Sequence, residues 1–585
     1  MSRNKWMIWL LAILPALAGL LAFSTVFLPY EKLSSLLNIL SPDGNYSTLR
    51  PDNAVVFRFL FAGFGLAAFL GAYLIGFHKW KMVKAFFRQL WEDTRRFFAA
   101  MRIAKEERFF LIALLFVVVM AVIRRLADIN IPMQHDESYT VVNFADSFWH
   151  AITDYSLPNN HVFHTILVWL SKKWFGMAPW AVRLPAFIAG VLVIPAIYFL
   201  ARRLYDHWTA LMASLLAAFS PMLISYSVNS RGYSLVALLT LLIILLGSFV
   251  RREKNLFAWG LISLLSALGF FTVPTMLFSF VILFIWLFFE NLVTGPGAYC
   301  SKREFVIYWL VAGAATAVLT VLFYTTILIY AGPQQLLGNR TIAPLAWGDF
   351  LAASRSQITE TWSQWTFGVP WAVPVLLAAG ILLSIVFHRR LSRDRIPWQL
   401  AAFVGIAAVL IIQRLNAPVR VWLFLQPLML IWGAAGTIGL LRGIRLKFTR
   451  GVSLAAIVTG AAFLIGLLAT VRIIPTFPER WAEKGDVETT ILYLESQLQE
   501  NDFIVVTIPD DAPVWYYSLL HGIDNSHFDK RIPFERALAL VEPVEGQTLK
   551  AVLAVRGPDE DILDIEAASL LKTFGKVQIF EVPRK

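Results

Sequence analysis

Two adjacent carboxylates, Asp136 and Glu137, follow a hydrophobic segment that ends near Leu126. Neighbouring carboxylates repel each other and burial disfavours their charged forms, so at least one of the two is expected to have a shifted pKa. A carboxylate just outside a membrane span suits general-base chemistry on a substrate that arrives through lipid. The alternative is a solvated loop with two ordinary acids, and the next residues of the chain favour the first interpretation.

Further polar side chains lie in the same segment, 127–180. Asn160 and His161 precede the stretch 165–175, which has the pattern of an amphipathic helix lying on the membrane surface. Three histidines in one segment also raise the question of a divalent metal, but their spacing matches no strong ligand motif. We therefore expect no required cofactor and keep a divalent metal as the alternative. The histidines are His135, His161 and His164.

The elements that must position these residues are membrane helices. Hydrophobic residues make up 58% of the 585 residues and charged residues 15%, with a mean hydropathy of +0.64, whereas a soluble domain has about 25% charged residues. Many apolar stretches approach the ~20 residues that cross a bilayer as a helix, which predicts an α-helical polytopic membrane protein with about 13 transmembrane helices. The single cysteine, Cys300, excludes an internal disulfide and a cysteine-based zinc cluster. The predicted spans are 7–29, 55–77, 108–127, 181–201, 207–228, 233–250, 255–271, 273–292, 305–331, 370–388, 398–415, 419–441 and 452–472.

Lysine and arginine residues gather in alternate loops, and such loops are normally cytoplasmic. If the N-terminus is cytoplasmic too, segments 127–180 and 332–369 and the C-terminal part all lie outside a plasma membrane. Arg124 and Arg125 are the exception to this rule. The net charge of +12 is then a topology signal that faces membrane lipid, not a sign of nucleic-acid binding. The basic loops are 78–107, 202–206, 251–254, 293–304, 389–397 and 442–451.

The chain divides into three predicted parts: two helices and a basic segment (1–107), a membrane core (108–472), and a soluble domain (473–585). The last part has eleven basic and twenty acidic residues, a net charge of −9. Its pattern predicts a small extracytoplasmic α/β domain. Predicted helices are 488–498, 512–520 and 565–574, and predicted strands are 502–508, 549–555 and 577–582.

Two sequence elements together resemble a known family. A carboxylate pair after an early span is followed by an Asn-His element, a surface helix and the run 180–185 (Trp-Ala-Val-Arg-Leu-Pro), which opens the next span. The second element, Ser225 to Ser234, reads Ser-Tyr-Ser-Val-Asn-Ser-Arg-Gly-Tyr-Ser. This layout over roughly 108–472 resembles GT-C membrane glycosyltransferases, in the branch with protein O-mannosyltransferases and lipid A aminoarabinose transferases. The chain departs from that pattern in its two extra N-terminal spans and in having Asn-His-Val-Phe in place of His-Pro-Pro-Leu.

The resemblance implies that Asp136 is the catalytic position, and we expect it to be the general base, with Glu137 orienting the acceptor or holding a partner. The alternatives are that Glu137 is the base or that neither residue is. A leaving phosphate needs cationic clamps, for which arginine is suited. Arg231 is the first candidate, and its alternative role is snorkelling to headgroups. Segment 332–369 is either a sugar-binding lid or an interfacial loop. Further candidates at the substrate site are Asn160, His161, Arg183, Tyr233, Arg414 and Arg420, with the Arg124–Arg125 pair.

The expected function is transfer of a sugar from a polyprenyl-phosphate carrier to an acceptor hydroxyl of a protein, lipid or envelope glycan, with inversion. The alternative is a transporter or flippase of lipid-linked sugars, and a third reading is a scaffold that presents the C-terminal domain. A transporter predicts polar residues in the middle of the membrane. The predicted spans are almost purely apolar, which favours the transferase.

Overall fold

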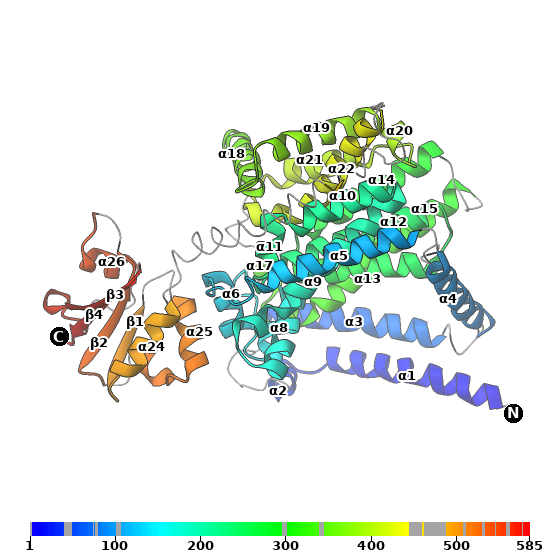
Figure 1. Cartoon of the computed structure of the whole chain (residues 1–585). Helices are drawn as coiled ribbons and strands as arrows, with labels where there is room; N and C mark the ends of the chain where they lie inside the picture. Colours follow the sequence, from blue (N-terminus) through cyan, green and yellow to red (C-terminus); the bar gives the residue numbers. More distant parts are fainter. Residues whose placement is uncertain are drawn as a thin grey trace.

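The computed structural model is mostly helical, with a bundle of long helices and a small domain beside one end of it (Figure 1). This arrangement confirms the predicted fold class, a polytopic helical protein with a C-terminal α/β domain. The structure describes residues 3–39, 49–73, 75, 80–100, 107–294, 301–337, 344–443, 459–460, 487–506, 511–528, 533–543, 546–556, 562–575 and 577–585.

The N-terminal part is a helical hairpin attached to the side of the bundle. α1 (Arg3–Val26) packs on α3 (Pro51–Tyr73) at two small residues, because a Cβ on Gly65 would lie 2.4 Å from the Phe23 ring and 3.3 Å from the carbonyl of Gly19. Such small residues allow membrane helices to approach closely. Asn53 donates to the carbonyl of Tyr330 at 3.1 Å and so fixes α3 to the bundle. α2 (Tyr30–Ile39) and α4 (Trp80–Ala100) complete this part.

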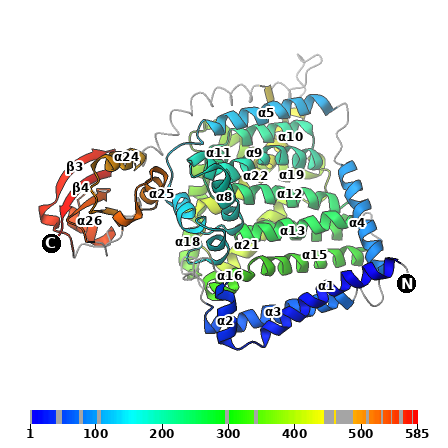
Figure 2. The ribbon, with the colours of Figure 1, turned by 90° about the horizontal axis from the view of Figure 1, so that it is seen from below.

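The bundle is built around α12 (Tyr233–Val250), which is apolar on all sides and almost entirely buried. A helix of this kind belongs in the centre of a bundle, with its neighbours screening it from lipid. Figure 2 shows the long helices running side by side. They are α5 (Arg108–Leu126), α9 (Pro179–Leu204), α10 (His207–Ala218), α13 (Leu256–Thr272), α14 (Met276–Thr294), α15 (Lys302–Phe323), α19 (Ala372–Val386), α21 (Trp398–Gln413) and α22 (Leu425–Gly443).

Every predicted span up to residue 441 coincides with one helix or with two consecutive helices, and the span 452–472 lies outside the described residues except for 459–460. Within the described residues, 7 helices are long and apolar enough to cross a membrane, or 8 if a bent pair counts as one span. That pair is α10 and α11 (Pro221–Ser227), which meet at 63°. Pro221 lacks the backbone N–H that would continue the first helix, so the chain turns there.

Short helices cover the end of the bundle at which the C-terminal domain lies. The predicted surface helix 165–175 is α8 (Val162–Phe175), with His164, Thr165 and Val168 buried and Trp174 exposed. Segment 332–369 contains α18 (Trp347–Trp365), while residues 338–343 lie outside the described part. The others are α6 (His135–Tyr139), η3 (Thr140–Phe144), α7 (Phe148–Thr153), α16 (Thr325–Tyr330), α17 (Pro333–Leu337) and η5 (Val419–Phe424).

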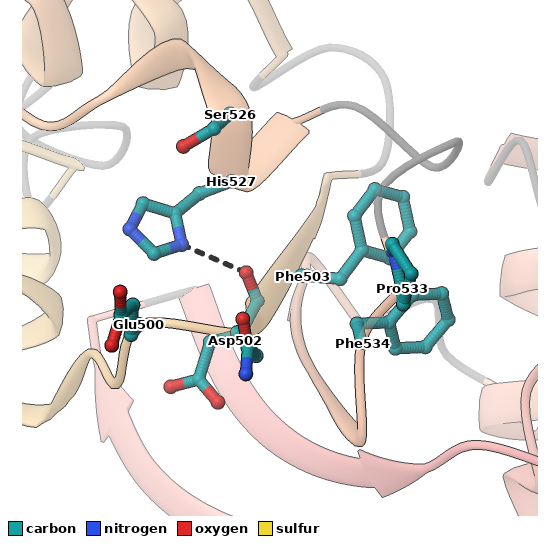
Figure 3. A pocket seen from close by; sticks show the side chains of 8 residues that line it. Glu500, Asp502, Phe503, Ser526, His527, Pro533 and Phe534 are labelled. Atoms are coloured by element: carbon teal, nitrogen blue, oxygen red, sulfur yellow. Dashed lines mark hydrogen bonds between the residues drawn. The ribbon is translucent and has the colours of Figure 1, made fainter.

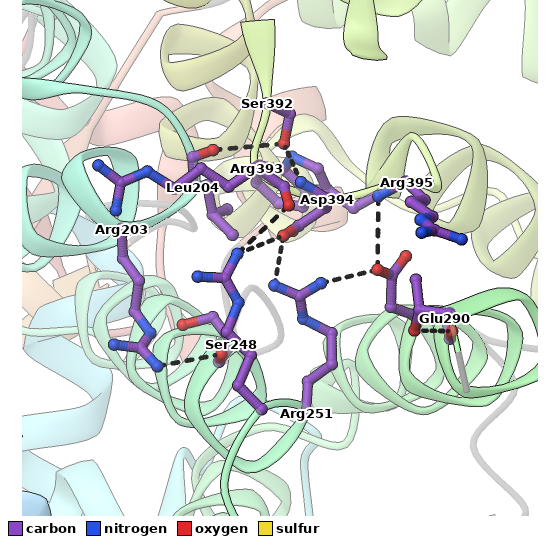
Figure 4. Close-up of polar contacts among 12 residues, drawn as sticks. Arg203, Leu204, Ser248, Arg251, Glu290, Ser392, Arg393, Asp394 and Arg395 are labelled. Carbon is purple, nitrogen blue, oxygen red and sulfur yellow. Dashed lines mark hydrogen bonds and ion pairs between the residues drawn. The ribbon is translucent and has the colours of Figure 1, made fainter. Parts of the chain in front are cut away.

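At the opposite end, buried ion pairs join three segments of the bundle (Figure 4). Arg251 pairs with Glu290 at 2.7 Å and with Asp394, and Arg252 reaches Asp394 at 3.3 Å. α20 (His388–Leu391) leads into this cluster. Paired charges of this kind fix the ends of α12 and α14 against the loop before α21, and they occupy part of the basic loops that the sequence assigns to the cytoplasm.

The C-terminal domain has one four-stranded sheet in the order β1-β2-β4-β3. β1 (Asp502–Val506) and β2 (Arg536–Val541) are parallel, whereas β4 (Val577–Pro583) is antiparallel to both β2 and β3 (Ser569–Phe574). β3 lies at an edge and is exposed along most of its length, with a register shift between Leu570 and Lys572. The remaining elements are α24 (Val487–Gln497), α25 (Asp511–His521), η6 (Asn525–Phe528), α26 (Leu549–Arg556) and η8 (Ile565–Ala567).

Three expectations for this domain were wrong. Segment 549–555, predicted as a strand, is the helix α26, and segment 565–574, predicted as a helix, is η8 followed by β3; β2 was not predicted at all. A short apolar run has the same composition in a buried helix and in a strand, so its pattern does not separate the two.

A small pocket lies beside β1 (Figure 3), but the carboxylate of Asp502 in its wall is already bound by Arg536 at 2.7 and 2.9 Å.

Candidate active site

The carboxylate pair lies on α6, at the end of the bundle near the C-terminal domain (Figure 1). α6 begins after Gln134, whose backbone N–H donates to the Glu137 side chain at 2.9 Å. This contact satisfies one of the amide groups that a helix start leaves without a partner. Because the two side chains are neighbours on a short helix, they point in different directions, and the structure gives them different surroundings.

Glu137 is fully buried and is held by Arg183 of α9. The guanidinium donates Nε to Oε2 at 3.0 Å and Nη2 to Oε1, and the backbone N–H of Ser230 donates to Oε2 at 2.8 Å. Arg183 also donates Nη1 to the carbonyls of Ile129 and Ile131. All nitrogens of Arg183 are therefore occupied in this structure, where Arg183 fixes Glu137, and its contact with a lipid phosphate stays a prediction.

Asp136 has an exposed position among cations. Its side chain is 36% exposed, and its Oδ2 lies 3.5 Å from Nη1 of Arg420 and 4.0 Å from Nη2 of Arg231. Nδ1 of His135 lies 3.7 Å from Oδ1. His135 and, to a smaller extent, the two arginines lower the pKa of Asp136 to about 2, against the opposite effect of partial burial. The pKa of Asp136 is therefore shifted, but downward, opposite to the direction that carboxylate repulsion and burial would give, because the neighbouring cations outweigh both.

Arg231 lies behind this carboxylate and is only 3% exposed. Its Nη1 donates to the carbonyl of Asp136 at 3.2 Å, to Oγ1 of Thr140 at 3.2 Å and to the carbonyl of Asn159 at 3.1 Å. Its guanidinium carbon is 5.8 Å from the centre of the Tyr233 ring. Arg231 therefore points into the site and does not snorkel, while its Nε is buried without a hydrogen-bond partner.

His161 lies against Arg231 on the other side. Its Nδ1 accepts from the backbone N–H of Gly232 at 2.9 Å, and its Nε2 lies 3.3 Å from Nη2 of Arg231. Burial and, second, Arg231 lower the pKa of His161 well below its usual value, so the ring is neutral and adds no positive charge beside the arginine. A Cβ on Gly232 would lie 3.2 Å from His161 and 2.5 Å from Thr272, which explains the glycine.

Asn160 is turned away from Asp136. Its Nδ2 donates to the carbonyls of Ala151 and Asp154 at 3.1 and 2.7 Å, and its Oδ1 accepts from Thr165 at 2.9 Å. The side chain is buried, and its contacts fix the loop between α7 and α8. Asn160 therefore supports this loop in the structure, and substrate binding by Asn160 stays a prediction.

Arg420 and Tyr233 complete the surroundings of Asp136. Arg420, on η5, is 43% exposed, which makes it the most accessible cation beside the carboxylate. Tyr233 is buried edge-on against His161 at 4.8 Å and against Tyr226 at 5.3 Å. The structure therefore brings together Asp136, Arg231, Tyr233, His161 and Arg420 from four separate segments of the chain.

The other arginine candidates lie elsewhere. Arg124 forms a buried pair with Asp128 at 2.6 Å, and Arg125 donates to Ser227 and to the carbonyls of Ala121 and Ala218. These contacts explain two arginines outside the basic loops. Arg414 ends α21 in the left-handed conformation (φ 49°), with its guanidinium 5.5 Å from the ring of Trp347 on α18.

Sequence reasoning missed the contribution of the C-terminal domain to this site. Nε2 of His135 lies 3.2 Å from Oδ1 of Asp511 on α25, and Tyr517 accepts a hydrogen bond from the backbone N–H of Met133 at 3.0 Å. Asp136 and Asp511 raise the pKa of His135 to about 9. Contacts between residues so far apart in the chain leave no local signal. Within the described residues, no three His, Cys, Asp or Glu side chains are grouped to hold a metal ion.

The fold is that of a multi-pass membrane protein with the architecture of GT-C glycosyltransferases. Residues 161–324 match the family model described as dolichyl-phosphate-mannose-protein mannosyltransferase. The match covers less than a third of the chain; it includes Arg231 and leaves out Asp136 and Arg420. No curated protein matches the chain by sequence.

The fold is also similar to that of solved structures. ArnT from Cupriavidus metallidurans in the apo state is similar with a TM-score of 0.50 and 11% identity, over 80% of this chain and 97% of ArnT. The same ArnT bound to undecaprenyl phosphate gives 0.48 and 11%, over 81% and 98%. The Archaeoglobus fulgidus oligosaccharyltransferase gives 0.45 and 13%, over 73% and 67%. The predicted resemblance to GT-C membrane glycosyltransferases is confirmed, and the chain has their fold.

Proposed function

We propose that this protein is a membrane glycosyltransferase that moves a sugar from a polyprenyl-phosphate carrier to an acceptor hydroxyl. Asp136 is the general base, and Arg420 and Arg231 bind the carrier phosphate. The observation that carries the proposal is a partly exposed carboxylate between two arginines at one end of the helical bundle. The short distances from Asp136 to both arginines support a site in which one bound sugar phosphate contacts the proposed base and the proposed phosphate ligands together.

The reaction follows from these positions. Asp136 accepts the proton of the acceptor hydroxyl while that oxygen forms a bond to the anomeric carbon of the sugar. The bond from this carbon to the phosphate oxygen breaks, and the phosphate leaves with the electron pair. A single displacement of this kind inverts the anomeric configuration. Arginine stabilises the departing phosphate through charge-assisted hydrogen bonds, which strengthen as its negative charge grows.

The low pKa of Asp136 has a consequence for this step. With His135, Arg231 and Arg420 nearby, the carboxylate is ionised but is a weak base. A phosphate that engages the two arginines withdraws part of their charge from Asp136, and the carboxylate becomes more basic. Donor binding would thus raise the pKa of Asp136 and make it a better proton acceptor. No cofactor is required in this scheme, because phosphate is already a good leaving group; a divalent ion is the alternative, and activity after dialysis against a chelator distinguishes the two.

The position of the candidate site also bears on which side of the membrane it faces and on the alternative function, transport. We propose that α6 and the C-terminal domain face the outside of the plasma membrane and that the acceptor is a protein, lipid or envelope glycan. A transporter or flippase of lipid-linked sugars is the second candidate. The polar groups around Asp136 and around Asp394 gather at the two ends of the bundle rather than at mid-membrane depth, where transported polar groups would need them. This distribution favours transfer chemistry.

The direct test is Asp136→Asn in purified protein reconstituted into nanodiscs with a polyprenyl-phosphate sugar and an acceptor. We expect the rate of transfer to fall by two orders of magnitude or more, because an amide keeps the shape and cannot accept the proton. Donor binding, measured by titration, should stay close to that of the parent. Near-normal turnover by the Asn variant would exclude Asp136 as the base.

A further inference from the structure

α4 takes no part in the proposed reaction and lies at the end of the molecule opposite α6 (Figure 1). Figure 2 shows it crossing the ends of α12, α13 and α15 instead of running alongside them. In a protein whose bundle spans the bilayer, a helix in this position lies along a membrane surface. α4 also precedes the residues that match the family model, so a role for this helix does not depend on the proposed function.

One face of α4 is attached to the bundle by specific contacts. Asp93 is fully buried; its Oδ2 accepts from the backbone N–H of Leu256 at 2.6 Å, and its carbonyl accepts from Asn255 at 2.8 Å. Phe97 packs edge-on against Phe249 at 5.2 Å and Phe257 at 5.7 Å. These contacts fix the rotation of α4 about its own axis, and therefore which residues face outward.

The outward face carries an aromatic stripe. Phe87, Trp91 and Phe98 are 62%, 59% and 61% exposed. Their spacings of four and seven residues place the three rings on one side of the helix. Large exposed aromatic side chains in a row are unfavourable in water and mark a surface that contacts lipid or another apolar surface.

A basic stripe adjoins the aromatic one. Lys84, Arg88 and Arg95 are exposed and repeat the same spacings of four and seven residues. The guanidinium of Arg95 lies 5.0 Å from the centre of the Trp91 ring, so the two stripes touch. Glu92 pairs with Arg88 at 3.3 Å, but an exposed pair of this kind is weak and leaves the arginine able to reach a phosphate.

We propose that this outward face of α4 binds anionic phospholipid headgroups at the membrane surface. The aromatic stripe lies among the upper acyl chains, and the basic stripe contacts the phosphates just above them. This is the arrangement of an interfacial amphipathic helix, in which apolar insertion and attraction to anionic lipid act together. Charge complementarity favours lipid over a protein partner, because the cations follow the edge of the aromatic stripe as headgroups follow the edge of the acyl region.

The first experiment measures the depth of each stripe in full-length protein with the Cys300→Ser substitution, reconstituted into nanodiscs of phosphatidylcholine and phosphatidylglycerol. Spin labels are placed at Phe87→Cys and, as a matched control, at Ala85→Cys, which is exposed on a different side of α4. We expect the label at position 87 to collide with oxygen and to be shielded from a water-soluble nickel chelate, and the label at 85 to show the reverse. Equal exposure of both labels to the chelate would overturn the proposal.

The second experiment measures lipid preference. Arg88→Gln with Arg95→Gln removes two exposed arginines from α4, and Arg389→Gln with Arg390→Gln removes two from α20 as the control. The preference of the protein for spin-labelled phosphatidylglycerol over phosphatidylcholine should fall about five-fold or more in the α4 variant, the loss expected for one headgroup contact. The control should keep the parent's preference. The proposal would be overturned if the α4 variant kept the parent's preference for phosphatidylglycerol. It would also be overturned if the control lost as much of that preference as the α4 variant.

Discussion

At the scale of single residues, the two arginines beside Asp136 differ in what they are free to do. Arg420 is exposed, whereas Arg231 is buried and also holds the backbone of Asp136 and Asn159. Loss of either removes a contact to the donor phosphate in our proposal. Only the loss of Arg231 also removes hydrogen bonds to the backbone carbonyls of Asp136 and Asn159, so the two variants should fail in different ways.

We expect Arg420→Ala to weaken donor binding by about one to two orders of magnitude, since a charge-assisted contact is worth roughly 1.5–3 kcal/mol. Arg420→Lys should recover only part of the lost donor affinity, because lysine keeps the charge but cannot make the two parallel hydrogen bonds of a guanidinium. Arg231→Ala should lower both donor affinity and the rate of the bound complex. Titration and single-turnover rates in nanodiscs separate these effects. Parent-like binding by both alanine variants would contradict the phosphate site.

The pKa values give a pH prediction. Asp136, with its pKa lowered from 3.8 to about 2, is stabilised as a carboxylate at every pH above 3.8, and this stabilisation disappears as the pH falls to about 2. The acid limb of the pH profile of kcat/KM, which reports the donor-free protein, should therefore lie below pH 3.8. His135→Gln removes the largest cause of the shift, so the limb should move upward toward the ordinary value.

Values of kcat/KM between pH 2 and 7 check this prediction, with activity recovered after return to pH 7 as the control for unfolding. The pKa of His135 is shifted in the opposite direction from that of Asp136. Its pKa is raised from 6.5 to about 9, so its ion contacts with Asp136 and Asp511 are complete below pH 6.5 and are lost as the pH rises through about 9. An acid limb in the His135→Gln variant that coincides with the parent's would contradict the assigned cause.

Sequence reasoning reached some of these residues and not others for a physical reason. Asp136, Arg231 and Arg420 each stand at the end of an apolar run, where hydropathy and charge patterns carry information. No hydropathy or charge pattern in the sequence predicts which residues pair with Glu137. Arg183 lies in the first turns of a span, and its pairing with a buried carboxylate 46 residues earlier depends on how α6 folds back onto α9.

At the scale of elements, α6 is joined to α9 by the buried pair between Glu137 and Arg183. Glu137→Gln would leave Arg183 buried without a full counter-charge, and breaking a buried pair costs about 3–5 kcal/mol. We expect a clearly lower thermal unfolding midpoint for the purified variant. Glu92→Gln, which breaks only the exposed pair with Arg88, is the matched control and should change stability by less than about 1 kcal/mol. Equal midpoints for the two variants would show that the buried pair does not support the fold.

Helices and strands were predictable to different degrees. A membrane helix extends its signal over about 20 residues, and every span that falls within the described residues coincides with helix. In the C-terminal domain the elements are short, and the edge strand β3 has neither a buried face nor alternation, since most of its residues are exposed. A pattern that depends on burial cannot identify a strand that is not buried.

At the scale of the whole molecule, the proposed orientation makes a prediction about accessibility. Ser526→Cys on the C-terminal domain and Arg390→Cys on α20, each with Cys300→Ser, place single exposed cysteines on opposite sides of the membrane if the basic loops are cytoplasmic. A membrane-impermeant maleimide added to intact cells should label position 526, and position 390 only after the membrane is opened. The reverse pattern would invert the topology and move the candidate site to the cytoplasm.

The edge strand β3 has a consequence for how the chain behaves at high concentration. The outer side of an edge strand presents unpaired N–H and C=O groups to any second copy, and Leu570 and Leu571 add exposed apolar surface there. The register shift between Leu570 and Lys572 bends this strand, and the ammonium of Lys572 lies near the rings of Tyr493 and Phe574 at 4.6 and 5.1 Å. A kinked strand with a charge at its centre is a poor template for intermolecular pairing. We therefore expect the register shift and Lys572 together to protect this exposed edge against aggregation.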